Sequence, residues 1–177
     1  MASFDTAVDR AFDRLRGNVV ADRVFYAASE LGDFGLIWVM FGTLKALRQG
    51  DNLAGALHMT AAMGVESVLV NGIIKSCFRR TRPPWEVERP LRVRRPLTSS
   101  FPSGHATSAV SAAIILSEDD DLWPLYAVVA ALVATSRIYV KIHHASDVAG
   151  GIAVGVALGL IGRRLMPTTA TQAAGRP

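Results

Sequence analysis

Residues 145–166 read ASDVAGGIAVGVALGLIGRRLM, and this stretch decides the fold class. Charged residues stand only near its two ends, and the stretch is about as long as a helix that crosses a bilayer, roughly 20 residues. Gly151, Gly155 and Gly159 recur at intervals of four, which favours close packing against another helix of the same bundle. The stretch therefore predicts a membrane-spanning helix.

Four further apolar stretches precede it, at residues 24–47, 53–74, 106–116 and 123–140. Short, strongly charged segments separate them, which is typical of a membrane bundle. Ionisable residues inside these stretches are expected to pair or to lie at the interface rather than to catalyse; they are Glu30, Asp33, His58 and Glu66. We predict an all-α, integral-membrane helical bundle of about five transmembrane helices, the first of them the weakest.

The segments outside the apolar stretches have distinct compositions. Residues 1–22 place apolar and charged residues on opposite sides of a helix, which predicts an amphipathic helix at the membrane interface or packed on the bundle. Residues 76–101 are rich in arginine and proline and form an extramembrane basic loop. Residues 1–166 are expected to form a single domain, and residues 167–177 a disordered tail.

Composition excludes several classes of protein. The single cysteine, Cys77, rules out an internal disulfide and a cysteine-based metal cluster. The net charge of +4 is small and the basic residues gather at helix ends, so no nucleic acid partner is expected. The first twenty residues lack the apolar core of a cleavable signal peptide.

The distribution of basic residues predicts the topology. If every apolar stretch crosses once, fourteen basic residues lie on the side of the 76–101 loop and five on the other. The positive-inside rule then places the loop in the cytoplasm, in a multi-pass protein of the plasma membrane. This orientation depends on the first stretch being a true crossing.

Three short blocks of residues suit phosphoryl transfer. They read KSCFRRTRP at 75–83, PSGH at 102–105 and SRIYVKIHHASD at 136–147. In the last block His143 and Asp147 are four apart and share one helix face. Asp147 can accept the Nδ1 proton of His143 and leave Nε2 free to attack phosphorus.

The same blocks supply groups that bind an anion. Lys75, Arg82 and Arg137 provide three fixed cations for phosphate oxygens, so no metal is required. Ser103 and Gly104 stand where a loop enters a helix, and free backbone N–H groups there favour an anion. His144 breaks the spacing to Asp147 and is interpreted as a loop residue.

The three blocks resemble the K-x6-R-P, P-S-G-H and S-R-x5-H-x3-D signature of the type 2 phosphatidic acid phosphatases. Eleven specified positions match in the expected order, and the resemblance covers residues 75–147. It implies a membrane enzyme that hydrolyses a lipid phosphate monoester, without a metal cofactor, through a phosphohistidine on His143. His105 would protonate the departing alkoxide and then activate water. The site would open at the headgroup region, on the cytoplasmic face.

The compact length and residues 12–31 are similar to the small actinobacterial members of this family. That similarity implies decaprenylphosphoryl-5-phosphoribose as substrate and a place in arabinan precursor synthesis for the cell-wall arabinogalactan. Other lipids stay open, namely a polyprenyl pyrophosphate, phosphatidylglycerol phosphate or phosphatidate. A vanadium-dependent haloperoxidase and a non-catalytic lipid-binding membrane protein are further alternatives. The glycine stripe at residues 151–159 also leaves open a homo-oligomer.

Overall fold

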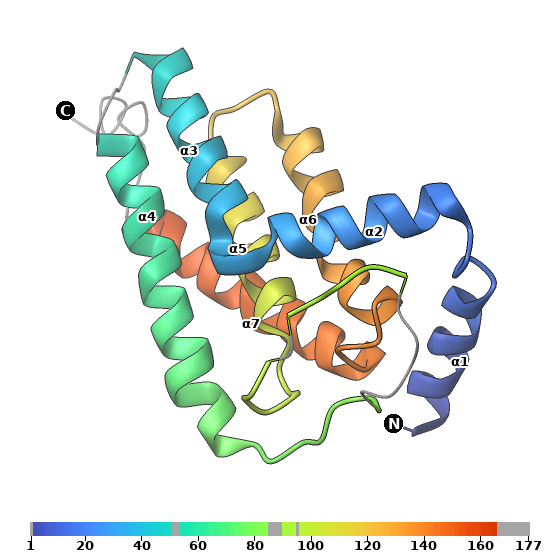
Figure 1. Ribbon diagram of the computed structural model, residues 1–177. Coiled ribbons are helices and arrows are strands. Elements are labelled where there is room, and N and C mark those ends of the chain that lie inside the picture. Colours follow the sequence, from blue (N-terminus) through green and yellow to red (C-terminus); the bar gives the residue numbers. More distant parts are fainter. Residues whose placement is uncertain (1, 51–53, 85–89, 95, 166–177) are drawn as a thin grey trace.

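The computed structural model describes residues 2–50, 54–84, 90–94 and 96–165 (Figure 1). All regular structure within these residues is helical, so the predicted all-α class is confirmed. The helices are α1 (Ala2–Asp13), α2 (Val19–Leu31), η1 (Asp33–Gly35), α3 (Leu36–Gln49), α4 (Ala54–Ser67), η2 (Val68–Ile74), η3 (Lys75–Cys77), α5 (Gly104–Leu116), α6 (Trp123–Tyr139) and α7 (Ala145–Leu165). The predicted tail at 167–177 and parts of the basic loop, at 85–89 and 95, lie outside the described residues.

The glycine stripe of α7 packs against α5, as predicted. A Cβ atom on Gly151 would come within 2.6 Å of the Ser103 carbonyl oxygen, and one on Gly155 within 2.7 Å of the Thr107 carbonyl oxygen. A Cβ atom on Gly159 would come within 2.9 Å of the Ile114 side chain of α5. Because α7 contributes no side chain along this stripe, the starts of α5 and α7 pack closely together, and both starts carry predicted site residues.

The five predicted apolar stretches are all helical, but they differ in length. Ala56–Cys77 and Ala145–Leu165 are long and apolar enough to cross a membrane. Helices α5 and α6 are apolar but shorter. Helices α2 and α3 qualify only as a pair, and the pair is bent by 62°. By length and composition the described residues therefore contain two crossings, or three if the bent pair is one span.

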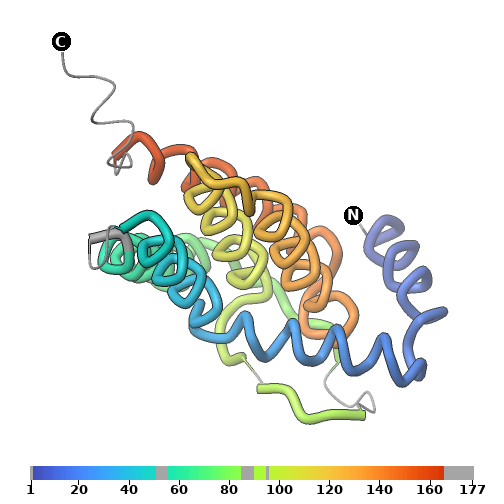
Figure 2. The backbone as a smooth tube through the Cα atoms, turned by 90° about the horizontal axis from the view of Figure 1, so that it is seen from above, coloured from blue at the N-terminus to red at the C-terminus, as the bar shows by residue number. Residues whose placement is uncertain are grey.

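The predicted first span, 24–47, is broken near its middle. Phe34 and Gly35 have φ angles of 58° and 69°, in the left-handed region that ends a regular α-helix. Helix α2 consequently lies across one end of the bundle while α3 runs along it (Figure 2). The predicted N-terminal helix at 1–22 is also two helices, because α1 ends at Asp13 and Asn18 caps the start of α2 through its side-chain oxygen.

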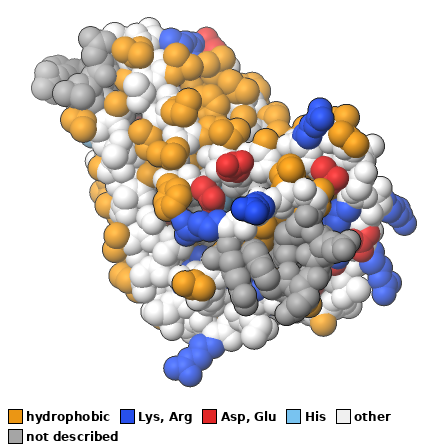
Figure 3. Space-filling view, viewed as in Figure 1, with side chains coloured by type: hydrophobic (Ala, Val, Ile, Leu, Met, Phe, Trp, Pro, Cys, Tyr) orange, Lys and Arg blue, Asp and Glu red, His pale blue; other side chains and the backbone are white. Residues whose placement is uncertain are grey.

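The surface supports a membrane setting. Helix α3 exposes large apolar side chains one helical turn apart, at Leu36, Met40, Leu44 and Leu47. Figure 3 shows apolar side chains spread over the part of this face formed by α3 and its neighbours, while most charged side chains gather toward the α1 end. An extended apolar surface of this kind suits contact with lipid rather than water. Helix α1 packs on the bundle through Val8 and Phe12.

We predict that Gly155→Ala destabilises the protein, because the added methyl group meets the fixed backbone oxygen of Thr107. Overpacking of this kind costs about 1–3 kcal/mol and should lower the melting temperature in detergent by several degrees. Gly64→Ala is the matched control, since a Cβ there meets nothing within 4 Å. Equal melting temperatures for the two variants would contradict the packing described for α5 and α7.

Candidate active site

A cavity of about 610 Å³ lies where the three sequence blocks meet. Six of the eight predicted site residues line it, namely Lys75, Arg82, Gly104, His105, Arg137 and His143. The other two, Ser103 and Asp147, are buried immediately behind this lining. A volume of several hundred Å³ is typical of small-molecule sites and exceeds the space that a phosphate group alone needs.

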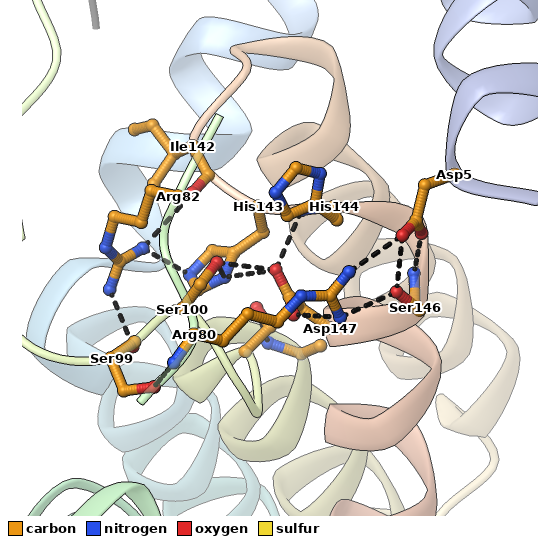
Figure 4. Close-up of polar contacts among 12 residues, drawn as sticks. Asp5, Arg80, Arg82, Ser99, Ser100, Ile142, His143, His144, Ser146 and Asp147 are labelled. Atoms are coloured by element: carbon orange, nitrogen blue, oxygen red, sulfur yellow. Dashed lines mark hydrogen bonds and ion pairs between the residues drawn. The ribbon is translucent and has the colours of Figure 1, made fainter. Parts of the chain in front are cut away.

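His143 is held in one orientation between α6 and α7. Its backbone N–H donates to the Arg137 carbonyl at 3.0 Å, and the whole residue is only 3% exposed. Its Nε2 lies 3.0 Å from Arg82 Nη1 (Figure 4). A guanidinium can only donate, so Nε2 is assigned as the acceptor and Nδ1 as the nitrogen that carries the proton. This tautomer directs a lone pair into the cationic cavity.

Asp147 is fully buried and accepts three hydrogen bonds. Its Oδ2 accepts from Ser100 Oγ at 2.5 Å and from the His144 N–H at 2.8 Å, and its Oδ1 accepts from Arg80 Nη1 at 2.8 Å. The expected direct bond to His143 is longer than a hydrogen bond, since Oδ2 lies 3.6 Å from Nδ1. Ser100 Oγ, from the loop before α5, lies 3.5 Å from the same Nδ1 and thus contacts both members of the pair from one side.

Burial keeps the imidazole of His143 neutral. It lowers the pKa of His143 below its ordinary value, and although the neighbouring carboxylate of Asp147 opposes this change, the positive charges of Arg82, Arg137 and Lys75 reinforce it. The neutral ring is the form that can act as a nucleophile. The environment therefore favours the reactive protonation state.

Lys75 and Arg137 present positive charge to the cavity. A Cβ on Gly104 would lie 3.4 Å from Lys75 Nζ, so the glycine lets the start of α5 approach this ammonium closely. Arg137 Nη1 donates to Ser29 Oγ, whereas the buried Nε of Arg137 has no hydrogen-bond partner among the described residues. A buried donor without a partner is costly, and a bound anion would satisfy it.

Arg82 both shapes the loop and faces the cavity. Its guanidinium donates to the carbonyl oxygens of Thr98 at 3.1 and 3.2 Å, of Ser99 at 3.1 Å and of Ile142 at 3.2 Å. Burial lowers the pKa of Arg82 to about 10, which leaves the group protonated near neutral pH. A phosphate that approaches His143 Nε2 therefore meets a fixed positive charge.

Ser103 lies behind the cavity rather than in its lining. Its Oγ accepts from the Ala106 N–H at 3.5 Å as the N-cap of α5, and its own N–H donates to the Asp147 carbonyl at 3.0 Å. The structure therefore places this predicted phosphate ligand where it caps α5 and joins that helix to α7.

The sequence did not predict a series of polar contacts that connects Asp147 to α1. Arg80 bridges two carboxylates, since its Nη2 donates to Asp5 Oδ2 at 2.7 Å while its Nη1 donates to Asp147 (Figure 4). Asp5 also accepts from the Ser146 N–H at 2.7 Å, which ties α1 to the start of α7. Arg80 stands inside the first sequence block and could have been suspected. Asp5 lies 75 residues before Arg80 and carries no local signal.

Comparison with known proteins assigns this arrangement to a family. Residues 55–170 match the sequence profile of the PAP2 superfamily. The chain belongs to the PAP2 superfamily. It is therefore a membrane phosphatase of the phosphoric monoester hydrolase class. The residues of the three sequence blocks that line the cavity all lie within the range 55–170.

Two curated relatives of this PAP2 phosphatase are mycobacterial. The decaprenylphosphoryl-5-phosphoribose phosphatase of Mycobacterium tuberculosis is 34% identical over 138 residues, which cover 75% of this chain and 73% of the relative. The protein of the same name from Mycolicibacterium smegmatis is 32% identical over 128 residues, which cover 71% and 68%.

Two solved structures share the PAP2 fold. The transmembrane PAP2-type phosphatidylglycerolphosphate phosphatase of Bacillus subtilis superposes with a TM-score of 0.71 at 23% identity, covering 93% of this chain and 85% of that one. Aquifex aeolicus LpxE superposes with a TM-score of 0.69 at 26% identity, covering 90% and 94%. Both likenesses extend beyond the matched profile to the N-terminal helices.

The described residues contain no group of three or more His, Cys, Asp or Glu side chains arranged to hold a metal ion. Positive charge at the cavity comes instead from lysine and arginine. Metal independence stays a prediction that requires an assay.

We predict that Arg80→Gln lowers kcat, because it leaves the buried Asp147 without its charged partner. Loss of a charged hydrogen bond to a buried group costs about 1.5–3 kcal/mol, which corresponds to roughly a tenfold to hundredfold effect. Arg79→Gln removes the same charge from the exposed neighbouring position and should change kcat little. Equal effects of the two variants would show that charge alone, and not the Asp147 contact, is responsible.

Proposed function

We propose that this PAP2 phosphatase hydrolyses a lipid phosphate monoester through a phosphohistidine formed on Nε2 of His143. The observation that carries the proposal is the buried imidazole whose Nε2 lone pair faces a cavity lined by Lys75, Arg82 and Arg137. An in-line nucleophile surrounded by fixed cations is the arrangement that phosphoryl transfer requires.

The proposed reaction has two steps. In the first, Nε2 of His143 attacks phosphorus, the bond from phosphorus to the ester oxygen breaks, and His105 gives its proton to the departing alkoxide. In the second, water attacks the phosphohistidine, His105 takes a proton from that water, and the bond from nitrogen to phosphorus breaks. Free phosphate then leaves and both histidines return to their initial states. Neither step requires a metal ion.

Asp147 supports both steps without contacting phosphate. It is held by Arg80, Ser100 and the His144 N–H, so its negative charge stays beside His143. That charge stabilises the positive charge that develops on the imidazole as Nε2 bonds to phosphorus. Ser100 Oγ passes this interaction on to Nδ1.

Decaprenylphosphoryl-5-phosphoribose is the proposed substrate, in arabinan precursor synthesis for the cell wall. The names of the two mycobacterial relatives support it. The cavity also has room beyond a phosphate, and polar side chains of Ser67, Asn71 and Thr98 stand among its lining residues. A sugar phosphate needs hydrogen-bonding groups of this kind around its hydroxyls.

The test is phosphate release by purified protein in detergent with EDTA present, from decaprenylphosphoryl-5-phosphoribose, a polyprenyl pyrophosphate, phosphatidylglycerol phosphate and phosphatidate. We expect EDTA-resistant release that is fastest from the first lipid and is lost in His143→Ala. His144→Ala is the matched control and should keep activity, because only the backbone of His144 contacts Asp147. Faster release from another lipid would show that the proposed substrate is wrong. Full activity of His143→Ala would overturn the proposed mechanism.

We further propose that the site faces the cytoplasm at the plasma membrane. The excess of basic residues on the side of the 76–101 loop supports this orientation, with fourteen residues against five. Cys77 is exposed, lies two residues after Lys75 and is the only cysteine of the chain. It therefore offers a natural reporter of the face on which the site opens.

A membrane-impermeant maleimide should label Cys77 in inside-out vesicles and not in right-side-out vesicles. Asp119→Cys in a Cys77→Ser background should give the opposite pattern, because Asp119 follows α5 at the other end of the bundle. If Cys77 reacts only in right-side-out vesicles, the site opens on the outer face and the proposed orientation is wrong.

A further inference from the structure

The break between α2 and α3 touches His105. A Cβ on Gly32 would come within 2.8 Å of His105 Cδ2 and 2.7 Å of Val133 Cγ1, so only glycine fits between the break and the two helices behind it. Phe34 and Gly35, which follow Asp33, take left-handed conformations. A bulky side chain in that region is strained, and such strain persists only where surrounding contacts hold it.

The break carries a carboxylate to the imidazole. Asp33 Oδ1 lies 2.9 Å from His105 Nε2, and both residues line the cavity. The contact has the distance of an ion pair but not the angle of a hydrogen bond, so the Nε2 proton is available to another acceptor.

The Asp33 carboxylate beside Nε2 favours the ring that carries both protons, whereas burial of the ring opposes it. That form is the one a general acid needs before the alcohol leaves. The charged neighbours mostly oppose it. The other ionisable groups that line the cavity are Glu66, Lys75, Arg82, Arg94, Arg137 and His143. Glu66 is the only other carboxylate among these described residues, so Asp33 supplies the negative charge in contact with His105.

Residues 29–34 also contact Arg137, which is a predicted phosphate-binding residue. Ser29, in the last turn of α2, accepts from Arg137 Nη1 through its hydroxyl. Arg94 stacks on Phe34 with its guanidinium carbon 4.7 Å from the ring centroid. Residues 29–34 thus contact His105, Arg94 and Arg137 at the cavity. Residues 29–34 themselves lie outside the matched family profile, which begins at residue 55.

We propose that the break between α2 and α3, at residues 32–35, is a positioning element for the leaving-group step, in which the Asp33 carboxylate orients the His105 ring and stabilises its positive charge until the departing alkoxide takes the Nε2 proton. Asp33 is thus a positioning residue that acts through His105. The inference rests on the proposed function, since it assigns His105 the role of general acid.

The test compares kcat/KM for two substrates of wild type, Asp33→Asn and Glu30→Gln. The value of kcat/KM reports the steps up to and including departure of the alcohol. A poor leaving group must be protonated as it departs, whereas a good leaving group departs as an anion. For octyl phosphate we expect Asp33→Asn to lose about tenfold or more of kcat/KM. For p-nitrophenyl phosphate, whose leaving group is stable as an anion, the loss should stay within about threefold.

The pH profile gives a second readout. Without the Asp33 carboxylate the His105 imidazolium loses stabilisation and gives up its proton at lower pH. The alkaline limb of kcat/KM for octyl phosphate should therefore move to lower pH in Asp33→Asn, while Asp33→Glu keeps it near the wild-type position. Glu30→Gln removes an exposed charge from the same helix end, outside the cavity lining, and should match wild type in both readouts.

Gly32→Ala provides an independent variant if Asp33→Asn fails to fold, because its methyl group displaces the break from His105 and should produce the same selective loss. Equal losses for both substrates, or no loss for either, would overturn the inference while leaving the proposed function intact. A wild-type protein that hydrolyses neither these nor any lipid phosphate would overturn the proposed function, and the inference with it.

Discussion

The site depends on one buried carboxylate. Asp147 is excluded from solvent, and a charge in that position is tolerated only when its oxygens are paired. The partners come from separate segments, namely Arg80 after η3, Ser100 before α5 and the His144 N–H at the start of α7. Satisfying this carboxylate therefore brings the three sequence blocks to one place. The glycine stripe of α7 makes the arrangement possible, because it lets α5 and α7 meet without intervening side chains.

Positive charge determines what the assembled site can bind. Lysine and arginine side chains from three elements face one cavity, and the imidazole of His143 is kept neutral beside them. A bound anion would reduce the mutual repulsion of these cations. It would also accept a hydrogen bond from the buried Arg137 Nε, which lacks a partner among the described residues. The apolar surface along α3 provides a region suited to lipid tails. A lipid phosphate is the ligand that matches both halves.

Periodicity and short motifs predicted the helical class, the five apolar stretches and the residues that line the cavity, because each of these depends on local spacing. They did not predict the break at Gly32–Gly35, where apolar residues continue across a change of direction that two left-handed conformations produce. They also missed Asp5, and they predicted that Asp33 would pair or lie at the interface without identifying His105 as its partner, because both contacts join residues far apart in the sequence. Ser103 stays a predicted phosphate ligand, and the contacts that the structure gives it cap α5 and join that helix to α7. A motif identifies residues of one site but does not separate those that touch the ligand from those that hold the frame.

The proposed mechanism depends on a covalent bond between phosphorus and Nε2 of His143. The most direct measurement is to mix the protein with a ³²P-labelled lipid phosphate, quench within milliseconds in alkali, and locate the label by mass spectrometry of peptides. A phosphohistidine is stable to alkali and labile to acid. We therefore expect alkali-stable label on the peptide that contains His143 and no label on His143→Ala. Steady release of phosphate with no labelled enzyme, or label on another residue, would contradict it.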